Sequence, residues 1–241
     1  TFKFAIITLV ILPFLPNKAY GPLGVLNFYH IWLMVVFVSA ISFFGYVLVK
    51  VFGAKKGVGI TGIVGGLVSS TAVAMSFANK SKKNSKLFTN SFTLAIIMAS
   101  TMMFLRILFE ILVVNSSLLA SLIIPLGLMT LVGIGFSFYY FKEKKKDNGH
   151  SLELKSPFTL KPALKFGLFF AFILFLSKGA QMYLGTKGIY LTSIFSGLAD
   201  VDAITLSMAK LASNGTITEK VASSAITMAA MSNTFVKGGI V

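Results

Sequence analysis

Two carboxylates stand inside an apolar stretch of this chain. Asp200 and Asp202 lie near the middle of residues 190–209, which read YLTSIFSGLADVDAITLSMA. An acid at the centre of a membrane helix costs roughly 2.5–3.5 kcal/mol on insertion scales, so such residues are functional candidates. Because two residues on an α-helix differ in direction by about 200°, both acids reach one site only if the helix is broken, as at Gly197. Otherwise they have separate roles, one of them as the N-cap of a half-helix.

Three consecutive hydroxyl residues, Ser69, Ser70 and Thr71, stand in a second apolar stretch. They cannot share one face of an intact helix. A pair of glycines just before them favours a local break that exposes backbone carbonyls, which transporters tolerate where the break lines a cavity. The alternative reading is a packing stripe, because Gly62, Gly66 and Ser70 lie four apart and would let two helices approach closely.

Other polar groups occur in the remaining apolar segments. Arg106 and Glu110 lie four apart and can pair on one helix face. Lys237 has no acid near it in the sequence, so we expect it to neutralise one of the two aspartates from another segment. Asn233 adds an amide at membrane depth.

The candidate ion-binding side chains all offer oxygen atoms: Asp200, Asp202, Ser69, Ser70, Thr71 and Asn233. Hard cations such as Mg²⁺, Ca²⁺, Na⁺ and K⁺ take oxygen ligands, whereas copper and zinc favour Cys, His or Met. The chain has no Cys, and its two His fall in predicted loops. We therefore expect Asp200 and Asp202 to be the metal ligands, with a bound cation and no other cofactor.

These residues belong to two matched stretches of the chain. Residues 56–106 recur without a gap as residues 187–237, and the basic residues at their ends, Arg106 and Lys237, match as well. Where the first copy has Ser69 and Thr71, the second has the two acids. Duplicated membrane segments are typical of transporters, whose sites form at the repeat interface, so we expect the hydroxyls and the acids to meet there.

Composition makes this a membrane protein. Of its 241 residues, 56% are hydrophobic and 12% charged, about half the charge of a soluble domain. We predict an all-α, polytopic fold with about eight transmembrane segments and an internal structural repeat, in a single transmembrane domain over residues 1–241 that is a fragment of a longer chain. The predicted segments are 2–15, 31–52, 58–78, 88–113, 117–141, 162–183, 189–209 and 220–241.

The net charge of +15 lies mostly in short loops, notably residues 80–86 and 142–161. Basic loops mark the cytoplasmic side and meet anionic lipid there, which argues against nucleic acid as a partner. If the chain has eight segments, the third and the seventh run in the same direction, so the two copies are parallel. The similarity of the runs KFAIITLVIL and KFGLFFAFIL leaves an inverted arrangement open.

The segments GGLVSSTAVAMSFA, SGLADVDAITLSMA and MSNTFVKGG resemble the uncharacterised integral-membrane domain found C-terminal in MgtC/SapB-family proteins. The similarity covers nearly the whole chain. It implies a multi-pass protein of a bacterial or archaeal plasma membrane, loosely linked to magnesium physiology, and leaves the activity open.

We expect a transporter or channel for a hard inorganic cation, with or without proton exchange. Its expected partners are the lipid bilayer and the ion, and the sequence leaves a homo-oligomer open. The alternative is a regulatory membrane protein of MgtC type that acts on a partner complex. An anion pathway built on Arg106 and Lys237 stays open. We expect no enzyme, because an intramembrane aspartyl protease needs acids from two helices and no other predicted span offers an Asp.

Overall fold

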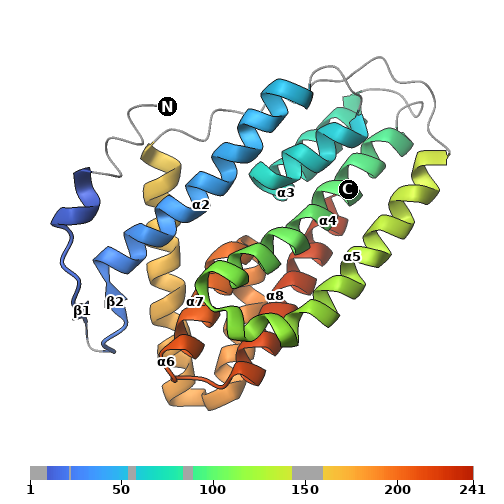
Figure 1. Cartoon of the computed structure of the whole chain (residues 1–241). Helices are drawn as coiled ribbons and strands as arrows, with labels where there is room; N and C mark the ends of the chain where they lie inside the picture. Colours follow the sequence, from blue (N-terminus) through green and yellow to red (C-terminus); the bar gives the residue numbers. More distant parts are fainter. Residues whose placement is uncertain (1–9, 22, 54–57, 84–88, 143–159, 241) are drawn as a thin grey trace. The chain divides into compact units, whose positions relative to one another are not determined.

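The computed structural model describes residues 10–21, 23–53, 58–83, 89–142 and 160–240 (Figure 1). Nearly all of them are helical. The elements in chain order are a 3₁₀ turn Leu12–Phe14, β1 Ala19–Tyr20, β2 Leu26–Asn27, α2 Phe28–Leu48, a π turn Val49–Gly53, α3 Val58–Lys83, α4 Thr89–Val114, a 3₁₀ turn Ser116–Leu118, α5 Leu119–Lys142, α6 Leu160–Ala199, α7 Val201–Ser213 and α8 Glu219–Ile240.

Among the described residues, five helices are long and apolar enough to cross a membrane, which agrees with an all-α membrane protein. These candidate spans are Phe28–Val51, Gly59–Ser81, Asn90–Val114, Ser116–Lys142 and Lys161–Ala199. Helix α7 has only 13 residues and is too short to cross a bilayer alone. Most of the first predicted segment, 2–15, lies outside the described residues. The count of about eight spans therefore stays a prediction.

The chain separates into two compact units. Unit 1 comprises Thr1–Ala40, Phe109–Leu122 and Phe158–Asn233; unit 2 comprises Ile41–Leu108, Ile123–Pro157 and Thr234–Val241. The unit boundaries fall inside helices α2, α4, α5 and α8. The first predicted copy, 56–106, belongs entirely to unit 2, and almost all of the second copy belongs to unit 1.

In unit 2, α3 and α4 pack closely through small residues. A Cβ atom built on Gly66 would lie 2.7 Å from the Cα of Ala99, and one built on Gly62 would collide with the carbonyl of Ala95. Real Cβ atoms do not approach backbone so closely, so only glycine fits at these two positions. The packing stripe expected for Gly62 and Gly66 is therefore confirmed.

In unit 1, α6 reverses direction within its length. Gly185 has φ 60° and ψ −141°, a conformation that L side chains rarely adopt, and separates two helical halves. The second half returns so closely that a Cβ on Gly188 would collide with the carbonyl of Ala180. The predicted segments 162–183 and 189–209 correspond to these two halves, with the second continuing into α7.

The N-terminal part of unit 1 is anchored by a small apolar core. The two-residue strands β1 and β2 pair antiparallel before the start of α2 (Figure 1). Trp32 and Val35 of α2 are buried together with Ala163 of α6. Gly167 lets α6 approach this face, because a Cβ there would lie 2.9 Å from the side chain of Val35.

We predict that Gly66→Ala destabilises the protein by about 1–3 kcal/mol, because the added methyl group overpacks the α3–α4 contact. Gly127→Ala in α5 is the matched control, since its Cβ would meet nothing within 4 Å. Thermal unfolding of the two variants in detergent measures the difference. Equal melting temperatures would contradict the close packing of α3 on α4.

Candidate functional site

Helix α3 is broken at Ser69. This residue has φ −167° and ψ 107°, an extended conformation inside an otherwise helical segment. Its hydroxyl oxygen accepts a hydrogen bond from the backbone N–H of Ala72 at 3.2 Å, as an N-cap does. The break predicted at Ser69–Thr71 is therefore confirmed, and it divides α3 into two half-helices.

The end of the first half-helix is covered by a guanidinium group. Nη1 of Arg106 donates hydrogen bonds to the carbonyl oxygens of Leu67 at 3.0 Å and Val68 at 3.3 Å. Carbonyls at a helix C-terminus carry partial negative charge, so a cation is favourable there. Because Arg106 is 6% exposed, its positive charge is held inside unit 2 by these oxygens.

A second buried cation lies at the start of the other half-helix of α3. Nζ of Lys237, on α8, donates to the hydroxyl of Ser70 at 2.6 Å and to the thioether sulfur of Met103 at 2.9 Å. Lys237 is 2% exposed. The structure thus brings together Lys237 and one of the three predicted hydroxyl residues within unit 2.

In unit 1 the corresponding break separates α6 from α7, and Asp200 occupies it. Asp200 is extended, with φ −156° and ψ 126°. Its Oδ1 accepts from the backbone N–H groups of Asp202 at 2.8 Å and Ala203 at 3.0 Å. The break lies at Asp200 and not at Gly197, the position that we considered for a site shared by both acids. The N-cap alternative therefore describes Asp200, and Asp202 follows it, part-exposed, in the first turn of α7.

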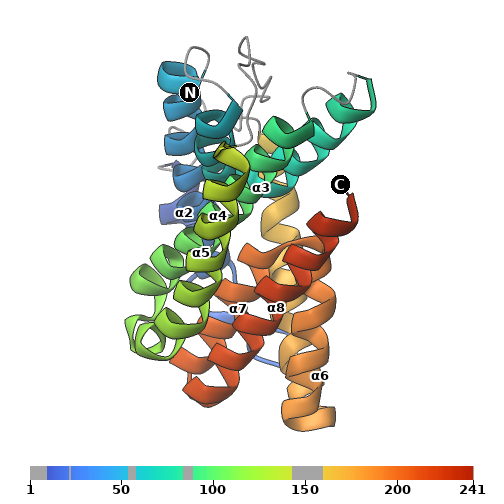
Figure 2. The ribbon, with the colours of Figure 1, turned by 90° about the vertical axis from the view of Figure 1, so that its right-hand side faces the viewer.

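Helix α8 donates hydrogen bonds to two carbonyls in the last turns of α6, before the break. Nδ2 of Asn233 donates to the carbonyl of Gly197 at 2.7 Å, and the hydroxyl of Ser232 donates to that of Ile194 at 2.9 Å. Figure 2 shows α8 beside the end of α6 and the start of α7. Asn233 is buried in this position, so its amide has a defined structural role.

The two breaks fall at matched positions of the predicted copies. Ser69 corresponds to Asp200, and each side chain caps the half-helix that follows it. A common local geometry is what a duplication requires. Superposition of residues 56–106 on residues 187–237 over their whole length stays a prediction.

The predicted meeting of the hydroxyls with the acids also stays a prediction, because Ser69, Ser70 and Thr71 belong to unit 2 and Asp200 and Asp202 to unit 1. The same holds for an ion pair of Lys237 with an aspartate and for the pair formed by Arg106 and Glu110. Glu110 is fully buried in unit 1. Within the described part of the chain, no cluster of three or more His, Cys, Asp or Glu side chains could hold a metal ion.

Reasoning from the sequence missed the backbone oxygens of the site. Residue type does not reveal these acceptors, because each belongs to an ordinary apolar residue. They are the carbonyls of Leu67 and Val68 and the sulfur of Met103. The only available indication was the glycine pair before Ser69, which predicted exposed carbonyls without identifying the group that covers them.

Comparison with known proteins matches residues 36–241 to a family model described as "Domain of unknown function (DUF4010)". A relative described as "Uncharacterized protein", from Aquifex aeolicus (strain VF5), is 37% identical over 192 residues, which cover 76% of this chain and 82% of the relative. No solved structure matches the chain.

We predict that Asp200→Ala lowers the free energy of unfolding by about 0.5–2 kcal/mol, because it removes the acceptor for two backbone N–H groups. Asp200→Asn should keep most of that stability, since Asn is an equally good N-cap. Thermal unfolding in detergent distinguishes the two. An equal loss in both variants would show that the negative charge, and not the cap, stabilises the break.

Proposed function

The chain belongs to the DUF4010 family, and we propose that it carries a hard inorganic cation across a membrane, as a transporter or channel. The five candidate spans in the described part of the chain indicate a membrane protein. The bacterial relative and the resemblance to MgtC/SapB-associated domains favour a prokaryotic plasma membrane.

One observation carries this proposal: the guanidinium of Arg106 on the carbonyls of Leu67 and Val68. It identifies the end of a half-helix in this repeat as a position where positive charge is stable. The matched carbonyls in the second copy are those of Leu198 and Ala199, at the exposed end of α6.

The second copy differs from the first in the basic residue at its end and in the residue at its helix break. Lys237 matches Arg106, but its ammonium group lies on Ser70 and Met103. Asp200 matches Ser69 and adds a carboxylate beside the helix end. We therefore propose that a mobile cation occupies the position that corresponds to the tethered guanidinium of the first copy.

The proposed ligands are the carbonyl oxygens of Leu198 and Ala199 and the carboxylates of Asp200 and Asp202. Such a set is made of hard oxygen donors and suits Na⁺, K⁺, Mg²⁺ or Ca²⁺ better than copper or zinc. The carboxylates also allow proton exchange. Half-helix ends that bind ions with their carbonyls are a recurrent device in secondary transporters.

A second candidate, an anion pathway, is favoured by the two buried cations of unit 2. Arg106 contacts a carbonyl before the break of α3, and Lys237 contacts the hydroxyl of Ser70 after it. Ser70 begins a half-helix whose N-terminus attracts negative charge. Reversal potentials that follow chloride or phosphate, with no response to cation gradients, would select this function.

We predict that Asp202→Asn abolishes cation flux into proteoliposomes, because it removes a carboxylate that is not used as the N-cap. Asp200→Asn should also reduce flux while preserving the fold. Glu219→Gln, an exposed acid at the start of α8, is the matched control and should leave flux unchanged.

Wild-type flux in both aspartate variants would overturn the proposed site. A different result, no flux of any ion by the wild-type protein together with co-purification of a stoichiometric partner, would instead favour the regulatory role that the MgtC/SapB resemblance implies.

A further inference from the structure

A groove of about 330 Å³ lies within unit 2, between α4 and α5 and bordered by Ile63 of α3. On α4 it is lined by Met98, Thr101, Met102 and Leu105, which share one helix face because they are three, four and seven positions apart. Its volume is at the lower end of the roughly 300–1,000 Å³ that is usual for ligand sites.

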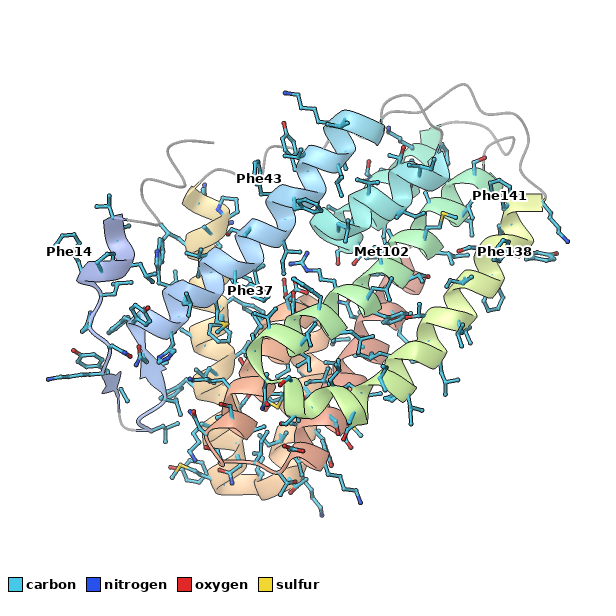
Figure 3. The ribbon with its side chains drawn as sticks, viewed as in Figure 1. Phe14, Phe37, Phe43, Met102, Phe138 and Phe141 are labelled. Atoms are coloured by element: carbon cyan, nitrogen blue, oxygen red, sulfur yellow. The ribbon has the colours of Figure 1, made fainter. Side chains whose placement is uncertain are left out.

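One face of α5 forms the opposite wall. Its lining residues, Ile134, Ser137, Phe138 and Phe141, show the same helical spacing. Figure 3 shows Met102 on α4 and the two aromatic side chains near the C-terminal end of α5. Lys142 is the last residue of α5 and is exposed. It is four positions after Phe138 and therefore projects from the same side of the helix.

The two hydroxyl residues in the walls have their donors satisfied by their own helices. The hydroxyl of Thr101 donates to the carbonyl of Ile97 at 2.9 Å, and that of Ser137 donates to Gly133 at 2.8 Å. Gly133 also limits the groove, because a Cβ atom there would collide with Thr101. The groove consequently offers apolar surface and sulfur, with a positive charge near one end.

We propose that this groove binds an acyl chain of an anionic phospholipid whose headgroup phosphate pairs with Lys142. The walls belong to three candidate membrane spans, so hydrocarbon is the medium beside them. An apolar lining suits the chain, and an ammonium group at the end of a span lies where headgroup phosphates are found. Met98 and Met102 adapt to a flexible occupant because thioether side chains have several rotatable bonds.

Native mass spectrometry of protein purified in detergent tests the site with two probes, phosphatidylglycerol and phosphatidylcholine. We expect the wild-type protein to retain phosphatidylglycerol in preference, and Ser137→Phe, which fills the groove, to lose that adduct. Lys142→Gln should reduce the preference at least several-fold, and Lys142→Arg should restore it. Two controls on exposed positions outside the groove, Leu128→Phe and Lys187→Gln, should behave as wild type.

A second measurement uses the wild-type protein and does not depend on the folding of a variant. Phosphatidylglycerol with a photoactivatable acyl chain should label Met98 and Met102 more strongly than the exposed Leu128. Equal labelling of these residues, or full retention of phosphatidylglycerol by folded Ser137→Phe, would overturn the proposal. Equal retention of the two lipids by the wild-type protein would also contradict the role of Lys142.

Discussion

The organisation of this protein depends on how it satisfies backbone groups at two interrupted helices. Within a bilayer, a carbonyl or N–H group that finds no partner costs several kcal/mol, so a helix can be broken only where side chains replace the lost bonds. Here each break has a cap on either side. After each break, the side chain of Ser69 or Asp200 accepts from the backbone N–H groups of the next half-helix. Before each break, the side chain of Arg106 or Asn233 donates to a carbonyl of the preceding half-helix.

This requirement explains the positions of two of the charged residues at the breaks. Arg106 is stable at low exposure because its partners are helix-end carbonyls with partial negative charge. Asp200 is suited to the start of α7, where the partial charge is positive. In each case the helix break creates the electrostatic environment, and the charged residue at that position completes it.

Much of this arrangement could be predicted from the sequence. Hydroxyl residues in a row after two glycines predicted the break in α3. The two acids drew attention to the second break, which lies three positions beyond Gly197, one of the alternatives considered. Small residues four apart predicted the close packing of α3 on α4, because a missing side chain is visible in sequence.

The contacts of Arg106 with backbone carbonyls and of Lys237 with Ser70 could not be predicted. Local spacing predicted a pair of Arg106 with Glu110, which stays a prediction, whereas only the fold brings the carbonyls of Leu67 and Val68 to the guanidinium. Lys237 contacts Ser70, a residue far from it in the sequence. Such contacts depend on which helices pack together, and residue type carries little information about that choice.

The guanidinium of Arg106 is covalently attached, and this has a consequence for stoichiometry. A charge that belongs to the chain cannot be exchanged with solution, so no ion is taken up or released at that position. If the two matched stretches arose by duplication and the second operates as proposed, each polypeptide turns over a single ion per cycle. The two helix breaks would then share a backbone geometry, while only the break at Asp200 would hold an exchangeable charge.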